Sequence, residues 1–137
     1  SYEKAFEYYE QAADLGFAQA QFNLGVMYTN GTGVKQSYEM ARRMYEKAAQ
    51  QGERTSMASL GDMYRDGEGV EVSYKRAFEY YKQAADLGLA NAQFNLGVMY
   101  YNGDGVERDI AKTREWWTKA ALQGNEDALK NLKLINS

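Results

Sequence analysis

The sequence predicts an all-α fold of about eight helices, built from 36-residue helix-turn-helix repeats. One stretch, residues 20–34, returns nearly unchanged as residues 92–106, and a looser copy at 56–70 lies halfway between them. Both offsets are 36 residues, with no insertion or deletion. A constant period of about 20 to 50 residues is typical of stacked-repeat proteins.

One helix of each repeat begins after a capping residue. Ser1 recurs in register as Ser37, Ser73 and Asp109, and an apolar-periodic run follows each of them. The side-chain oxygen of serine or aspartate accepts a hydrogen bond from a free first-turn N–H, which favours a helix start. Behind the caps, alanine and aromatic residues recur at i, i+4, i+7 and i+8, which is one face of a helix. These patterns predict helices over residues 2–15, 38–51, 74–87 and 110–123.

A glycine ends each of these helices, and a second helix follows almost at once. Glycine readily adopts the left-handed conformation that often follows a helix end. Glycines also lie inside the second helices at Gly25, Gly61 and Gly97, where glycine costs about 1 kcal/mol relative to alanine. A free-energy cost that recurs at the same position of each repeat predicts close contact between helices at that position. The second helices are predicted over residues 18–30, 54–66, 90–102 and 126–135.

The repeat register also predicts how the chain is divided. We expect a single domain over residues 1–137. We also expect it to be a fragment of a longer array, because its first repeat lacks a first half. Lys133 stands where the mid-helix glycine would recur, and terminal repeats need a polar outer face. The Lys133 side chain is therefore expected to be exposed, whereas Gly61 and Gly97 should be buried. The expected parts are a half repeat at 1–18, repeats at 19–54, 55–90 and 91–126, and a C-terminal capping helix at 127–137.

The composition argues against several classes of function. The 16 basic and 19 acidic residues give a net charge of −3, whereas nucleic acid and anionic membranes attract a basic patch. No stretch approaches the ~18 apolar residues of a membrane-spanning helix, so membrane insertion is not expected. The chain has neither histidine nor cysteine, so it lacks the commonest general base, the commonest metal ligand and a thiol nucleophile. We expect no catalytic, cofactor-binding or metal site and no enzyme activity.

The repeat resembles the Sel-1-like repeat family, a relative of the tetratricopeptide repeat. The resemblance covers the whole chain, and Ala58, Thr113 and Lys133 depart from its pattern. It implies a right-handed α-α superhelix, or solenoid, that works as a scaffold or adaptor in protein complexes. The absence of cysteine excludes the cysteine-rich branch of the family and, with the lack of a signal peptide, favours the cytoplasm. The residues that carry the resemblance are Ala20, Leu24, Gly25, Tyr28, Gly31, Gly33, Val34, Ala41, Tyr45, Ala48, Ala49 and Gly52.

A binding surface is indicated where the repeats differ most from one another. Four positions of the second helices vary between repeats at spacing i, i+3, i+7 and i+10, which is one helix face. In the arrangement that the resemblance implies, this face lines the concave groove. Exposed apolar residues interspersed with polar ones suit a peptide or partner-protein ligand. The predicted protein-binding residues are Phe22, Val26, Asp62, Arg65, Phe94, Val98 and Tyr101.

The predicted function is therefore a protein-binding scaffold, and alternatives remain. Phe22 and Phe94 could instead be packing residues between helices. A repeat-based hydrolase would need a nucleophile–base pair or metal ligands converging in one pocket. A purely structural spacer would present a polar, featureless concave face. The helix at 2–15 has no repeat before it, so we expect part of its surface to be exposed, where it could support end-to-end self-association.

Overall fold

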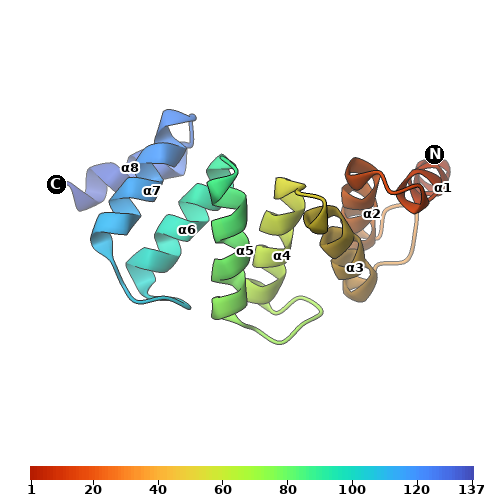
Figure 1. Cartoon of the computed structure of the whole chain (residues 1–137), viewed down its shortest axis with the longest axis horizontal. Helices are drawn as coiled ribbons and strands as arrows, with labels where there is room; N and C mark the ends of the chain where they lie inside the picture. The colour runs from red at the N-terminus through yellow and green to blue at the C-terminus, as the bar shows by residue number, and fades with distance from the viewer. The chain divides into compact units, whose positions relative to one another are not determined.

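The computed structural model describes all 137 residues as eight α-helices without a strand (Figure 1). The predicted all-α fold and all eight predicted helices are confirmed. The four capped helices end one residue earlier than predicted, because residues 15, 51, 87 and 123 are C-caps. The helices are α1 (Tyr2–Asp14), α2 (Ala18–Asn30), α3 (Tyr38–Gln50), α4 (Arg54–Asp66), α5 (Tyr74–Asp86), α6 (Ala90–Asn102), α7 (Ile110–Leu122) and α8 (Glu126–Ile135).

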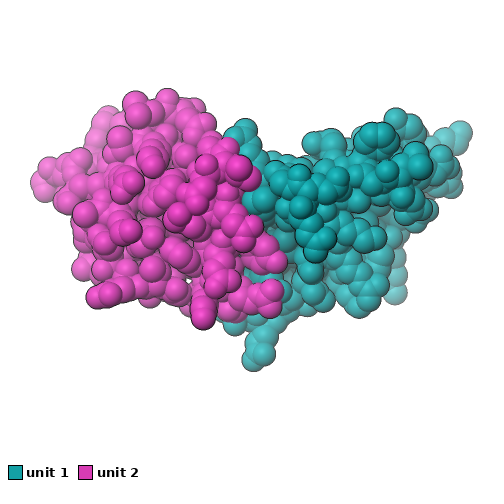
Figure 2. All heavy atoms as spheres, in the orientation of Figure 1, with its two compact units in different colours: residues 1–72 teal, residues 73–137 magenta.

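The chain divides into two compact units, which Figure 2 shows in different colours. Unit 1, residues 1–72, holds α1 to α4, and unit 2, residues 73–137, holds α5 to α8. Within unit 1, α2 packs against α1 and α3, and α3 packs against α4. Unit 2 repeats this order, since α6 packs against α5 and α7, and α7 packs against α8. Each unit is thus a series of helices in which neighbours in sequence are neighbours in space.

Residues close to each other in sequence determine where the helices begin. The Ser37 hydroxyl accepts from the N–H of Met40 at 3.1 Å, and the Asp109 carboxylate accepts from the N–H of Lys112 at 3.1 Å. Ser1 and Ser73 cap α1 and α5 in the same way. The four predicted N-caps are therefore confirmed, and each satisfies an N–H that the helix itself leaves free.

The mid-helix glycines make room for aromatic rings. A Cβ atom at Gly25 would lie 2.6 Å from Cδ1 of Tyr45, and one at Gly97 would lie 2.5 Å from Nε1 of Trp117. Both distances are well inside van der Waals contact, so only glycine fits without movement of the ring. The predicted close contact is confirmed at these two positions, and its partner is an aromatic side chain of the next helix. Gly61 and Gly97 are buried and Lys133 is exposed, as the sequence predicts.

Buried glutamines connect one repeat to the next. The Gln21 amide donates to the Ala13 carbonyl at 3.3 Å, and its oxygen accepts from Nε2 of Gln51 at 2.8 Å. In unit 2, Gln93 and Gln123 form the same pair at 2.9 Å. Because buried amides are costly unless they are hydrogen-bonded, these pairs favour one particular register of the helices.

Tyr45 makes the stability of unit 1 sensitive to alkaline pH. Burial raises the pKa of Tyr45 above its ordinary value of 10.0; Asp62 and Glu68 raise the pKa further, while hydrogen bonds with Thr29 and Ser59 oppose the rise. The raised pKa means that the folded state favours the neutral phenol. The corresponding stability is fully present below about pH 10 and is lost as the pH rises through the folded-state pKa.

We therefore expect the melting temperature to fall above about pH 10, and Tyr45→Phe to make this fall shallower because phenylalanine cannot ionise. Tyr2→Phe is the control, since the Tyr2 side chain is largely exposed. Melting curves followed by circular dichroism across this pH range give the comparison. An alkaline decline equally steep in Tyr45→Phe and in the unmodified chain would contradict the expectation.

Candidate functional site

Two predicted binding residues, Phe22 and Val26, lie on α2 in unit 1. Phe22 is half-buried, and its ring is tilted against that of Tyr45 with the ring centroids 5.9 Å apart. Together with Tyr2 and Tyr9 of α1, Phe22 and Val26 border an open hollow of about 380 Å³. Phe22 therefore both packs between helices and contributes to the surface.

The outer surface of α1 is exposed, as the sequence predicts. Tyr2 is 69% exposed and Tyr8 is 68% exposed. Tyr9 occupies the same repeat position as Tyr45. The Tyr45 ring packs against Gly25, whereas Tyr9 borders open hollows. In α8, Lys133 stands at that glycine position, so a second copy's α8 lacks the corresponding space for the Tyr9 ring. End-to-end self-association through α1 stays a prediction.

The predicted polar pair of unit 1, Asp62 and Arg65, lies on α4 and is ion-paired. The Arg65 guanidinium is 3.6 Å from the Asp62 carboxylate and 2.9 Å from the Asp66 carboxylate. All three side chains are partly open to solvent, where such pairs contribute at most about 1 kcal/mol. A ligand that used Arg65 would have to compete with these carboxylates.

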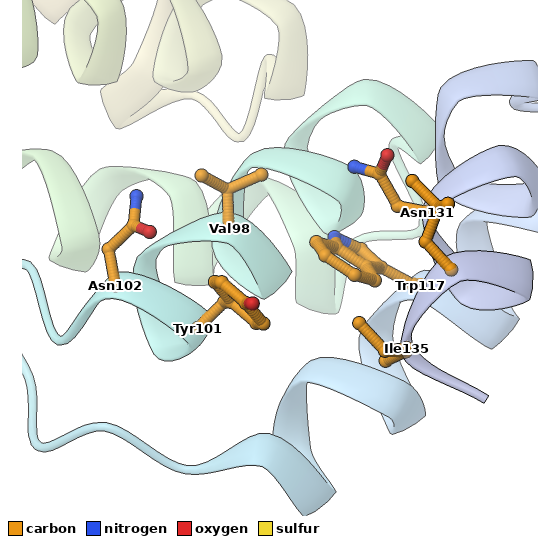
Figure 3. Close-up of a pocket in the computed structure, with 7 residues that line it drawn as sticks. Val98, Tyr101, Asn102, Trp117, Asn131 and Ile135 are labelled. Carbon is orange, nitrogen blue, oxygen red and sulfur yellow. The ribbon is translucent and has the colours of Figure 1, made fainter. Parts of the chain in front are cut away.

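In unit 2, the predicted residues Val98 and Tyr101 line a pocket of about 300 Å³ (Figure 3). Its walls come from three helices, α6, α7 and α8. Trp117 is only 3% exposed and so lies at the base of the pocket, whereas Tyr101 is 37% and Leu134 65% exposed at its edge. The lining residues are Val98, Tyr101, Asn102, Trp117, Asn131, Leu134 and Ile135.

Stacked aromatic rings hold the pocket in shape. The Trp117 ring stacks on the rings of Phe94 and Tyr101; both centroids lie 6.0 Å from that of Trp117, and both rings are nearly parallel to it. The indole N–H of Trp117 also donates to the Phe94 carbonyl at 3.0 Å. Offset stacking of this kind contributes about 0.5–1.5 kcal/mol beyond burial. The contacts of Phe94 favour its interpretation as a packing residue, whereas Tyr101 presents part of its ring to solvent.

A buried hydroxyl on α7 forms a hydrogen bond with α6 beside the pocket. Thr113 replaces the repeat's alanine and is fully buried, and its Oγ1 donates to the carbonyl of Gly97 at 3.0 Å. This carbonyl belongs to the glycine that accommodates the Trp117 ring. The departure of Thr113 from the repeat pattern therefore strengthens the helix pair that positions Trp117.

Two amides lie among the apolar walls of the pocket. The Asn131 side chain makes no hydrogen bond within the chain, and Nδ2 of Asn102 makes a long one, 3.4 Å, to the Asp104 carboxylate. Figure 3 shows Tyr101 and Trp117 between these two asparagines. An apolar base with polar groups beside it can bury a side chain while the amides bond to a peptide backbone.

Sequence reasoning missed most of the pocket. Leu134 lies 36 residues after Val98, so following the variable face into one more helix would have found it. Trp117 occupies the constant aromatic position of the repeat, which predicts a core residue. The lining residues that were not predicted are Asn102, Trp117, Asn131, Leu134 and Ile135.

The structure has no cluster of three or more acidic, histidine or cysteine side chains arranged to hold a metal ion. The longest helices have 13 residues, and none has the length and apolar character needed to span a bilayer.

The family model of the Sel1 repeat matches residues 1–17, 18–53, 55–89 and 90–125. The chain belongs to the Sel1 repeat family. Sel1 repeat proteins generally serve as protein–protein interaction scaffolds and are typically non-enzymatic. The last of the matched Sel1 repeats contains α6 and α7, and α8 follows it. The pocket thus lies between a complete Sel1 repeat and the helix after it.

Solved structures of Sel1 repeat proteins are similar over nearly the whole chain. A Sel1 repeat protein from Oxalobacter formigenes is 32% identical with a TM-score of 0.90, and the match covers 96% of this chain and 54% of that one. The protective antigen c5321 of uropathogenic Escherichia coli, which has an SLR fold, is 36% identical with a TM-score of 0.95, covering 98% of this chain and 29% of the antigen. This chain therefore spans about half or less of these two relatives.

A third similar structure is the cysteine-rich protein B of Helicobacter pylori. It is 26% identical with a TM-score of 0.76, and the match covers 94% of this chain and 92% of that protein. The present chain shares this fold without any cysteine. No curated protein matches the sequence.

Proposed function

We propose that this Sel1 repeat chain is a scaffold that binds a segment of a partner protein through the groove-lining face of its second helices. Its best-formed site is the pocket of unit 2, and this pocket is the observation that carries the proposal. The lining combines aromatic and aliphatic walls with two amides and contains no charged side chain. Such a lining suits binding of an apolar side chain.

The size of the pocket indicates what it holds. Its volume of about 300 Å³ lies at the lower end of the range for ligand sites, which suits one large apolar side chain rather than an extended ligand. An anchor of this kind in a desolvated pocket commonly supplies a large share of the binding energy at protein interfaces. Because Trp117 is already held by stacking and a hydrogen bond, little side-chain entropy is lost when the anchor enters.

The predicted residues of unit 1 provide a separate and weaker surface. Phe22 and Val26 border an open hollow, so they offer apolar contact without an enclosed pocket. Asp62 and Arg65 provide polar contact, but each already has an ion-pair partner. We propose that unit 1 offers a partner weaker contacts of its own, while the pocket of unit 2 holds the anchor.

Selection from an unbiased display library of short peptides against the full chain tests this proposal. We expect Tyr101→Ala and Leu134→Ala to weaken the affinity of the enriched peptides by about ten-fold, measured by fluorescence anisotropy, because both changes remove apolar wall. Leu122→Ala is the matched control, since Leu122 is 83% exposed and does not line the pocket. Peptides that bind equally to the unmodified chain, Tyr101→Ala and Leu134→Ala would refute binding at this pocket.

A further inference from the structure

Two arginines beside the pocket of unit 2 have no carboxylate partner. Nε of Arg108 donates to the Tyr101 carbonyl at 2.8 Å, and its guanidinium carbon lies 5.2 Å from the centroid of the Tyr101 ring. Nε of Arg114 donates to the side-chain oxygen of Asn136 at 3.1 Å. Asn136 directly follows the pocket residue Ile135 in sequence. Neither arginine forms an ion pair within the chain. The terminal nitrogens of both therefore remain available to an anion.

The corresponding positions in unit 1 show that the fold does not need these free charges. Position 36 corresponds to 108, and Gln36 donates to the Thr29 carbonyl at 3.0 Å, so a neutral side chain makes the same bond. Position 42 corresponds to 114, and Arg42 is paired with Glu46 at 3.0 Å. In unit 2 the position of that glutamate is occupied by a threonine, Thr118, whose hydroxyl donates to the Arg114 carbonyl.

Unit 2 also carries a more positive net charge than unit 1. Unit 2 contains nine lysines and arginines against eight aspartates and glutamates, whereas unit 1 contains seven against eleven. The acidic residues next to the two arginines in sequence are Glu107 and Asp109, which flank Arg108, and Glu115, which follows Arg114. The Asp109 carboxylate caps α7, and the Glu115 carboxylate pairs with Lys119. The net charge of −3 is thus concentrated in unit 1, and the pocket lies in the unit with a small basic excess.

We propose that the ligand of this pocket is an acidic peptide segment. One large apolar side chain of the segment enters the pocket, and carboxylates on residues flanking it bind Arg108 and Arg114. A guanidinium presents paired N–H donors that match the two oxygens of a carboxylate, and such charge-assisted bonds are stronger than neutral ones. This inference rests on the proposed function, because the carboxylates are placed by the anchored side chain.

The same unbiased library provides the test, read out by the composition of the peptides whose binding depends on Tyr101. We expect aspartate and glutamate to be enriched beside an apolar residue. Arg108→Gln should retain the bond that Gln36 makes in unit 1 and lose only the charge. We expect Arg108→Gln and Arg114→Gln each to weaken the affinity of an enriched acidic peptide by about two- to five-fold, with the difference shrinking at high salt.

Lys75→Gln is the control for a general charge effect, because Lys75 is an exposed cation of unit 2 that does not line the pocket. Tyr101-dependent peptides without acidic residues would overturn the acidic ligand and leave the proposed function standing. Acidic peptides that bind the Arg108→Gln and Arg114→Gln variants as tightly as the unmodified chain would do the same. A selection that yields no Tyr101-dependent peptide would overturn both.

Discussion

Gly97→Leu is expected to lower the free energy of unfolding of unit 2 by about 2–3 kcal/mol, in the upper part of the range of about 1–3 kcal/mol that overpacking of a filled core typically costs. The first atom of the new side chain already overlaps the Trp117 ring. That ring cannot readily move aside, because it stacks on Phe94 and Tyr101 and donates to the Phe94 carbonyl. Chemical denaturation followed by circular dichroism measures the loss.

Asn91→Leu is the matched control for Gly97→Leu. Residue 91 lies on the same helix, α6, but is exposed, so the leucine meets no neighbouring ring. Leucine is also the better helix former, so Asn91→Leu should leave stability unchanged or raise it slightly. Equal losses in the two variants would show that the glycine is not required by the Trp117 contact.

Trp117→Ala is expected to have the largest effect, a loss of about 3–5 kcal/mol, because it leaves a cavity at the centre of the α6–α7–α8 contact. Trp117→Tyr should cost less than about 1.5 kcal/mol. Tyrosine is the residue at the same repeat position in unit 1, where Tyr45 packs on Gly25 as Trp117 packs on Gly97. The tyrosine variant loses the indole hydrogen bond to the Phe94 carbonyl but retains a ring at the base of the pocket.

The two Trp117 variants also separate packing from binding. Denaturation curves report the stability of each, and anisotropy with a Tyr101-dependent peptide reports the state of the pocket. We expect Trp117→Tyr to bind the peptide with an affinity close to that of the unmodified chain, and Trp117→Ala to bind it weakly even where it is folded. Equal stability of Trp117→Ala and Trp117→Tyr would contradict the role assigned to the ring.

The sequence by itself determined the helices, their caps and the repeat register of this protein. A cap such as Ser37 or a helix end such as Gly16 depends on residues within four or five positions, so local chemistry is sufficient to place it. The 36-residue period then assigned equivalent residues in different repeats the same role. This is why Gly97, Lys133 and the four N-caps could be predicted without knowing any contact between helices.

Only the tertiary structure decided which side chains meet. The pocket joins Val98 to Ile135, and each lies on a different helix whose orientation depends on packing rather than on local sequence. The variable face predicted Val98 and Tyr101, but the ring beneath them, Trp117, belongs to a position that the repeat pattern marks only as core. The partner of Arg114 is also a tertiary property. Arg42 and Arg114 occupy the same repeat position, and Arg42 pairs with Glu46 within its own helix. Arg114 instead donates across helices to Asn136, the C-cap residue of α8.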